Sequence, residues 1–330
     1  MRCSEYETLS RRLPARRRTF HFFRDRHALI LLALHVGEGR SVSDLKASPL
    51  AGLLRRPVVR EVLAKLSGDT VRVDDLLVVW PRESHTYVVS LGVWGSERKG
   101  WCRCCYQTTR KGLNLVVRLN FNREHDRDFA RLMRAKEWHD PSRGGHPVDT
   151  DGRNTLAWVR VDLDLESRTA LIEEVQSDWV RDARAVHDAV VNGRTAWAWR
   201  WSGCQSAVDE RRVRDYQRYV LGPHLKTWAE SALTAAIVLL VKDLGIRSVY
   251  YHTFGTGMKL KKIDRRHAPP RSLYTDLPRR FAFRETDQAP PFLWENADGH
   301  TRYVLSRSNA RFHVHEWSED AVRDVAGLLE

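Results

Sequence analysis

Two strand-like segments near the middle of the chain constrain its fold more than any other feature of the sequence. Residues 156–163 and 169–177 are apolar and rich in β-branched side chains, and the short polar turn between them predicts a β-hairpin. A long apolar helix is predicted at residues 224–244, with Gly245 as its stop signal, and another strand at residues 246–253. This order predicts an α/β (α+β) fold with a mixed, largely antiparallel sheet and flanking helices.

Further segments add to this sheet and to the helices around it. Apolar and β-branched runs predict strands at residues 76–80, 86–94, 113–121, 301–305 and 311–315. Helical patterns predict helices at residues 24–37, 57–66, 125–138 and 272–277. The sequence thus predicts a basic, helical N-terminal region at residues 1–70 and an α/β domain at residues 71–330, which carries a tryptophan-rich insert at residues 180–222.

The chain is strongly basic, and the excess charge is concentrated near its beginning. Its 330 residues include 55 Lys and Arg against 42 Asp and Glu, which gives a net charge of +13. A basic arm contains Arg11, Arg12, Arg16, Arg17 and Arg18. Such an arm can neutralise phosphates and bind nucleic acid irrespective of base sequence. A solvated, frayed terminus explains the same residues without any partner.

The cysteines and the apolar runs bear on location. No apolar run approaches the roughly 20 residues of a membrane-spanning helix, and residues 1–18 lack the apolar core of a secretory signal. Five cysteines, an odd number, fit reduced thiols. We therefore expect a cytoplasmic protein without a membrane partner.

Two clusters have both a ligand-binding and a structural interpretation. The cysteines within residues 102–105 have no second pair downstream, so a short strand with inward thiols explains them better than zinc, and no metal is expected. The tryptophans within residues 197–201 alternate with other residues, as a stacking platform for nucleic-acid bases does. A strand with one aromatic face in the core explains this pattern without a ligand and is the favoured interpretation.

The segment that ends the hairpin carries the strongest indication of chemistry. Because side chains alternate along a strand, Glu174, Gln176 and Asp178 are predicted to share one face, with Glu173 on the other. Burying a wholly polar face in the middle of a sheet costs free energy, unless the face lines a cleft. Two carboxylates close together also raise each other's pKa toward the range of a general base. An edge strand with its polar face in water is the structural alternative.

The turn after the strand at residues 246–253 is a candidate ligand site. Ligands of open α/β sheets collect beyond the carboxyl ends of strands. The sequence offers His252 and Thr253 for substrate, two glycines with free backbone N–H groups, and three lysines for an anion, so the candidate cofactor residues are Gly255, Gly257 and Lys259. An ordinary turn with a packed histidine is the structural interpretation of the same residues.

Two resemblances follow from these motifs. The run at residues 172–179, a helix opening near Trp228 and the segment 245–250 resemble an uncharacterised group of bacterial and phage-associated proteins that share an E-[IV]-Q-S-D-W segment. More distantly, a hairpin, a long helix, a strand and a short helix with Tyr274 resemble the GNAT superfamily of N-acetyltransferases. This second resemblance implies that Tyr274 protonates a departing thiolate and that Glu174 or Asp178 deprotonates the acceptor amine.

The GNAT resemblance also implies acetyl-CoA or another acyl-CoA as cofactor. The superfamily's glycine-rich pyrophosphate loop has no counterpart, because residues 217–223 contain one glycine, and Pro223 removes an N–H donor. The leading hypothesis is an acyltransferase that acts on a polar or anionic acceptor, either a small molecule or a macromolecule. The alternatives are a non-catalytic nucleic-acid-binding protein that uses the basic arm, and a cofactor-free GNAT-like interaction module.

Overall fold

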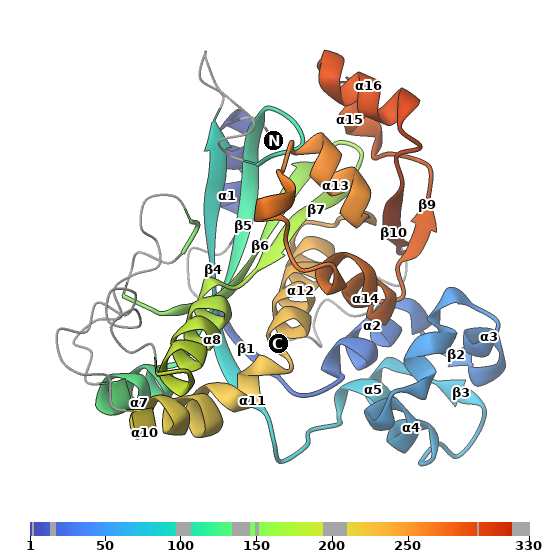
Figure 1. Ribbon diagram of the computed structural model, residues 1–330. Helices are drawn as coiled ribbons and strands as arrows, with labels where there is room; N and C mark the ends of the chain where they lie inside the picture. The colour runs from blue at the N-terminus through green and yellow to red at the C-terminus, as the bar shows by residue number, and fades with distance from the viewer. Residues whose placement is uncertain are drawn as a thin grey trace.

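An eight-stranded sheet forms the centre of the protein (Figure 1). The computed structural model describes residues 1, 3–13, 18–96, 107–133, 146–148, 152–193, 210–295 and 297–318. The strands lie in the order β1-β4-β5-β6-β7-β8-β10-β9. Their bounds are β1 Arg18–Phe22, β4 His85–Ser96, β5 Gly112–Asn120, β6 Thr155–Asp164, β7 Thr169–Gln176, β8 Ser248–His252, β9 Arg284–Thr286 and β10 Phe312–Glu316. Only β7 and β8 pair in parallel among these strands, so the predicted α/β fold with a mixed, largely antiparallel sheet is confirmed.

Helices cover both faces of this sheet. In chain order they are α1 Cys3–Arg12, α2 Arg26–Val36, α3 Val42–Lys46, α4 Pro57–Leu63, α5 Val73–Leu77, α7 Arg123–Met133, α8 Asp178–Val191, α10 Glu210–Asp215, α11 Gly222–Leu225, α12 Trp228–Val238, α13 Phe254–Leu260, α14 Ser272–Arg280, α15 Pro291–Glu295 and α16 Gly299–Arg307. A small two-stranded sheet, β2 Arg40–Ser41 and β3 Thr70–Val71, lies beside α2–α5 (Figure 1).

The main core lies between the sheet and α12. This helix contacts β5, β6 and β7, and small side chains at Ala232, Ala235 and Ala236 let it approach the sheet closely. The helix continues as the π-helical segment Leu239–Asp243 and stops at Gly245, whose φ of 65° favours glycine. A separate apolar cluster on β8 and β10 is covered by α13, α15 and α16.

A β-bulge interrupts the β6–β7 hairpin. Ile172 and Glu174 pair with adjacent residues of β6, which leaves Glu173 as an extra residue in β7. Ile172 and Val175, three residues apart, therefore both enter the main core. Glu173 and Glu174 both lie on the opposite face, where Glu173 meets His252 and Glu174 meets an arginine of β6.

Most predicted elements are present, including the hairpin, the strand near residue 250 and the helices that became α2, α4 and α14. The predicted strand at residues 76–80 is wrong. The Asp75 carboxylate accepts the Arg72 N–H at 2.8 Å and caps a helix, α5, whose buried Val73 and Leu76 pack beside α2. Val78, beyond the helix, is 76% exposed.

The predicted strand at residues 301–305 is also wrong, because this segment belongs to α16. Asp298 caps the helix by accepting the Thr301 N–H at 2.8 Å, and Thr301 and Val304 are buried at helical spacing. The predicted helix at residues 224–244 is divided, since α11 ends at Leu225 and α12 begins at Trp228. Among the described residues no single helix has the length and apolar composition of a membrane span, and only the bent pair Glu210–Leu225 and Trp228–Asp243 meets that test.

The first 70 residues are not purely helical, because β1 joins the main sheet beside β4. Arg18, predicted to be in the basic arm, begins β1 and pairs with Asp243 at 2.6 Å. Much of that arm, the cysteines at 102–105, the tryptophans at 197–201 and the end of the predicted helix at 125–138 lie outside the described residues. The division of the chain at residue 70 stays a prediction.

Candidate functional site

The parallel strands β7 and β8 pair over only part of their length. Their ladder runs from Thr169 opposite Ser248 to Ile172 opposite Tyr251, although both strands continue. We call the place where they part the β7–β8 fork; it comprises Glu173, Glu174, Tyr251, His252, Lys261 and Tyr274. Polar side chains gather there for two reasons. The bulge turns two glutamates to one face, and α13 and α14 bring Lys261 into contact with Glu173 and Tyr274 into contact with Tyr251.

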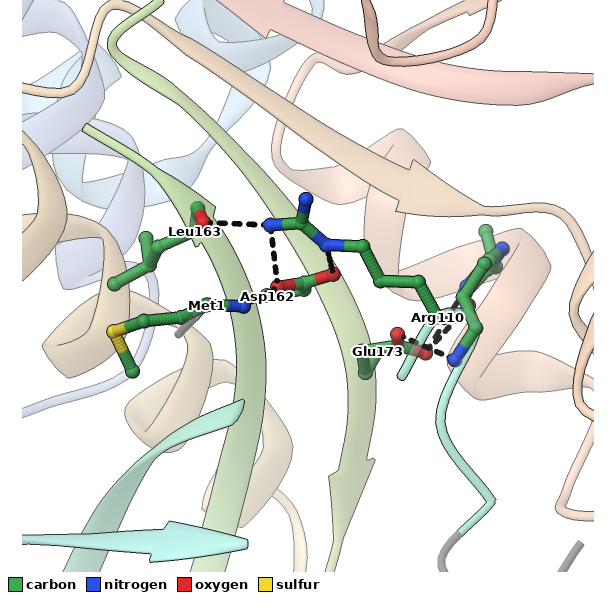
Figure 2. Close-up of polar contacts among 7 residues, drawn as sticks. Met1, Arg110, Asp162, Leu163 and Glu173 are labelled. Atoms are coloured by element: carbon green, nitrogen blue, oxygen red, sulfur yellow. Dashed lines mark hydrogen bonds and ion pairs between the residues drawn. The ribbon is translucent and has the colours of Figure 1, made fainter. Parts of the chain in front are cut away.

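Glu173 is the most deeply buried carboxylate of the fork, and it is fully hydrogen-bonded. Its Oε1 accepts the Thr109 N–H at 2.9 Å, and its Oε2 accepts the Thr109 hydroxyl at 2.8 Å. His252 Nε2 lies 3.3 Å from Oε2, and Lys261 Nζ donates to the Glu173 carbonyl at 2.6 Å. Figure 2 shows this carboxylate on β7 beside the ion pair of the neighbouring strand. A buried carboxylate with so many donors is held ionised.

The electrostatics of this network point to one protonation pattern. Burial opposes ionisation of Glu173, but its hydrogen bond from His252 and the neighbouring positive charges lower its pKa to about 2. Burial also lowers the pKa of His252, so its ring is neutral. With Glu173 as acceptor, Nε2 carries the ring proton, and Nδ1 has no hydrogen-bond partner among the described residues.

This arrangement differs from a nucleophilic triad. Thr109 Oγ1 lies 2.8 Å from His252 Nε2, the same ring nitrogen that faces Glu173. In a triad the hydroxyl and the carboxylate bind opposite ring nitrogens, so that the histidine can relay a proton between them. Thr109 is therefore a structural partner of the carboxylate rather than an activated nucleophile.

Glu174 is anchored but retains a free oxygen. The buried Arg160 guanidinium donates to Oε2 through Nε at 2.7 Å, and its Nη2 lies 2.5 Å from the same oxygen. Oε1 accepts no hydrogen bond within the described parts of the chain. Because the Glu174 side chain is 12% exposed, Oε1 is placed to receive a proton from a molecule that enters the fork.

Tyr274, the proposed acid of the sequence analysis, lies in α14 and faces the same place. Its ring packs edge-on against Tyr251, with centroids 5.8 Å apart, and Lys261 Nζ lies 5.9 Å from its centroid. Burial and the nearby Glu174 charge raise its pKa, so the phenol keeps its proton at neutral pH. Gly257 lies against this ring and His252, where a Cβ would come within 3.2 Å of the histidine Cβ.

Asp178 and Gln176, the other members of the predicted polar face, bind each other and neighbouring side chains, and their catalytic and substrate-binding roles stay predictions. Asp178 is the first residue of α8, and its side chain has no exposed surface. His146 Nδ1 lies 2.5 Å from Oδ2, while Arg181 and the Gln176 amide contact Oδ1 at 2.7 and 2.8 Å. These contacts give Asp178 a structural role, which is to hold residue 146 against α8.

Replacing Asp178 by Asn tests that role. The hydrogen bond with Asp178 raises the pKa of His146, and its side chain is 37% exposed. The pair therefore adds stability below the ordinary histidine pKa of about 6.5 and loses it as the pH rises through the higher folded value. In Asp178→Asn we expect the His146 pKa, followed by NMR of its ring protons, to fall. Asp188→Asn, an exposed change on the same helix, is the control, and an unchanged His146 pKa in Asp178→Asn contradicts the assignment.

The residues predicted to bind an anion have local structural contacts. Thr253 caps α13 by accepting the Thr256 N–H at 3.4 Å, and its hydroxyl donates to the Arg311 carbonyl at 2.9 Å. The Lys259 carbonyl contacts His300 Nε2 at 3.0 Å, and a Cβ on Gly255 would meet nothing within 4 Å. The role of Gly255, Gly257 and Lys259 in binding a cofactor stays a prediction.

A second buried ion pair lies beside the fork on β6 (Figure 2). Asp162 Oδ1 accepts the Met1 ammonium at 2.8 Å, and Arg110 Nε donates to Oδ2 at 2.6 Å. Arg110 also donates to the Leu163 carbonyl at 2.9 Å and lies over the Phe292 ring. Both oxygens of the Asp162 carboxylate are bound by cations, so the ion pair is a structural clamp between Met1, the segment before β5 and the sheet.

A group of potential metal ligands lies away from the fork. In the described parts of the chain, Asp25, His27 and Glu230 are the one such group found, with ligand atoms within 4.8 Å of one another. Arg56 lies 3.6 Å from Asp25, and Arg280 donates to Glu230 at 2.7 Å. Since each carboxylate already has a cationic partner, the cluster is accounted for as ion pairs.

Comparison of the chain with protein-family models, curated proteins and solved structures gives no significant match. The functional argument therefore depends on the geometry of the fork. Of its members, Glu174, His252 and Tyr274 were predicted from the sequence, whereas the contacts of Glu173 with Thr109 and of Glu174 with Arg160 were not. A lone arginine within an apolar strand is the signal that points to Arg160, because a buried cation requires an anionic partner.

Proposed function

We propose that the protein transfers an acyl group from a thioester to a polar or anionic acceptor at the β7–β8 fork. The observation that carries the proposal is geometric: Glu174, anchored by Arg160 with Oε1 unbound within the described residues, follows the end of the β7–β8 ladder, where the buried Tyr274 ring packs on Tyr251. A base and an acid in one site are what acyl transfer from sulfur to nitrogen requires.

In the proposed step Glu174 Oε1 removes a proton from the acceptor amine, and the nitrogen attacks the thioester carbonyl carbon. The carbon–sulfur bond breaks, an amide forms, and Tyr274 protonates the departing thiolate. The proton held by Glu174 returns through solvent to the phenolate, so the products are an amide and a free thiol. Arg160 positions the base by binding its other oxygen.

The order of elements supports this proposal by analogy. A hairpin, a helical crossover, a parallel strand and a helix with Tyr274 follow one another as the GNAT resemblance implies. Residues 217–223 differ from the pyrophosphate-binding loop of that superfamily, because they lie in the π-helical segment Tyr216–Leu221 and at the start of α11. Backbone N–H groups within a helix are already used by the helix, so this segment does not offer them to a pyrophosphate.

A thioester assay tests the proposal. We expect acetyl-CoA or a longer acyl-CoA to raise the melting temperature, and a panel of primary amines to accelerate thiol release, followed with a thiol-reactive chromophore. Glu174→Gln, which keeps an oxygen for Arg160, and Tyr274→Phe should each lower kcat about 100-fold or more while the acyl-CoA thermal shift persists. Glu166→Gln, an exposed change in the β6–β7 turn, is the control. If no thioester shifts the melting temperature or releases thiol, the proposal fails and the interaction-module alternative gains support.

A further inference from the structure

Tyr251 has a buried hydroxyl that the fold does not use. The side chain has no exposed surface, and its Oη makes no hydrogen bond within the described residues. Its ring is held by edge-on contacts with Tyr274 and with Phe283, at centroid distances of 5.8 and 6.1 Å. Phenylalanine would make the same ring contacts without burying an unpaired polar group, so packing does not explain the hydroxyl.

The position of Tyr251 connects this hydroxyl with the fork. Tyr251 is the last residue of β8 that pairs with β7, opposite Ile172, and on its other side it pairs with His313 of β10. The strand therefore fixes its backbone from both sides. Its ring packs edge-on on Tyr274, the proposed acid, at a centroid distance of 5.8 Å, and burial, the Tyr274 phenol and the charge of Glu174 all raise the pKa of Tyr251.

We propose that the Tyr251 hydroxyl is a substrate-binding donor, which donates a hydrogen bond to the carbonyl oxygen of the acyl group bound at the fork. This inference rests on the proposed acyl transfer. As the amine attacks, negative charge develops on that oxygen, and a preorganised donor in a site without bulk water stabilises it more than it stabilises the ground state. Burial favours the protonated phenol, so the donor is present at neutral pH.

The arrangement divides three tasks among three groups. Glu174 takes the amine proton, Tyr274 returns a proton to sulfur, and Tyr251 meets the carbonyl oxygen without gaining or losing a proton. A hydroxyl with this role lowers the stability of the unliganded protein, because it is desolvated without a hydrogen-bond partner. Stability and turnover should therefore respond to its removal in opposite directions, which a purely structural hydroxyl does not do.

The test compares Tyr251→Phe with Tyr250→Phe, its neighbour on the other side of the strand, whose ring contacts Phe312 in the second apolar cluster. For Tyr251→Phe we expect a melting temperature equal to or above that of the wild type, and a kcat with acetyl-CoA about 100-fold to 1,000-fold lower with KM changed less than about threefold. Tyr250→Phe should leave kcat unchanged.

The possible outcomes separate this inference from the proposed function. A wild-type protein that releases no thiol from any acyl-CoA removes the acyl-transfer proposal itself. An active wild type with an equally active Tyr251→Phe overturns the inference alone. A Tyr251→Phe variant that melts below the wild type also overturns it, because the hydroxyl then has a structural partner such as a buried water.

Discussion

Acidification from pH 7 to pH 5 is expected to destabilise the protein by several kcal/mol, an amount comparable with the whole stability of an ordinary domain. Four histidines, two of them buried and two half-buried, make the largest contribution. Burial lowers the pKa of His27, His35 and His224 to about 3 and that of His315 to about 4. Below the unfolded pKa of about 6.5 these histidines bind protons in the unfolded chain but not in the folded one. The free energy of unfolding is therefore highest above that pH. It decreases as the pH drops, by about 1.4 kcal/mol per pH unit for each histidine.

The His35–His315 contact shows why these rings stay neutral. His315 Nδ1 lies 2.9 Å from the Phe281 carbonyl and must donate to it, so its Nε2 is an acceptor. That acceptor lies 2.7 Å from His35 Nε2, which supplies the proton. A second proton on His315 would bring two N–H groups face to face between α2 and β10. The contact therefore cannot form with both rings charged, and burial opposes a charge on either ring.

Urea unfolding at pH 7, 6 and 5 measures this effect, with the slope of unfolding free energy against pH as the readout. His27→Phe should reduce the slope by about 1.4 kcal/mol per pH unit, because His27 packs on Phe281 and neither ring nitrogen has a hydrogen-bond partner in the described residues. His267→Phe, at an exposed position, is the control. A free energy of unfolding that stays flat between pH 7 and pH 5 would show that these rings are not buried as neutral groups.

Glu173→Gln is expected to cost about 1–3 kcal/mol of unfolding free energy, the range for leaving buried hydrogen-bonding groups with a weakened partner. The substitution keeps the shape of the side chain but takes negative charge away from Lys261, whose Nζ is fully buried beside it. It also leaves the Thr109 hydroxyl and His252 sharing a weaker acceptor. Charge loss, rather than lost packing, accounts for the effect.

Equilibrium denaturation of Glu173→Gln beside Glu166→Gln checks this prediction. The second variant makes the same chemical change in an exposed turn of the same hairpin and should alter stability by less than about 0.5 kcal/mol. A loss below about 1 kcal/mol for Glu173→Gln would mean that the carboxylate is not coupled to Lys261, and the role assigned to the Glu173 network would be wrong.

The sequence is informative where local patterns decide the structure. The hairpin, α2 and β8 follow from apolar periodicity and from glycine stops, which act over a few residues. The failures at residues 76–80 and 301–305 share one cause: the capping side chains Asp75 and Asp298 select helices in segments whose apolar residues also fit strands.

The candidate site was predictable only in part, because one extra residue in β7 breaks the alternation on which the prediction depended. Strict alternation assigns Glu173 and Glu174 to opposite faces, whereas the bulge brings both to one. Asp178 keeps a contact with Gln176 but belongs to α8 rather than to the strand, since β7 ends at Gln176 and α8 begins two residues later. The register of β7 depends on how it pairs with β6, and the sequence of one strand alone does not determine that pairing.

The parallel pairing of β7 with β8 has a consequence for how the protein acquires its site. About a quarter of the chain separates the paired residues, so joining them requires closure of a long loop, which is entropically unfavourable and slow compared with forming a hairpin. Glu174 and Arg160 meet as soon as the local hairpin forms, whereas Tyr251, Lys261 and Tyr274 arrive only with the crossover. During refolding the ion pair should therefore mature early, and the complete fork should be among the last features to form.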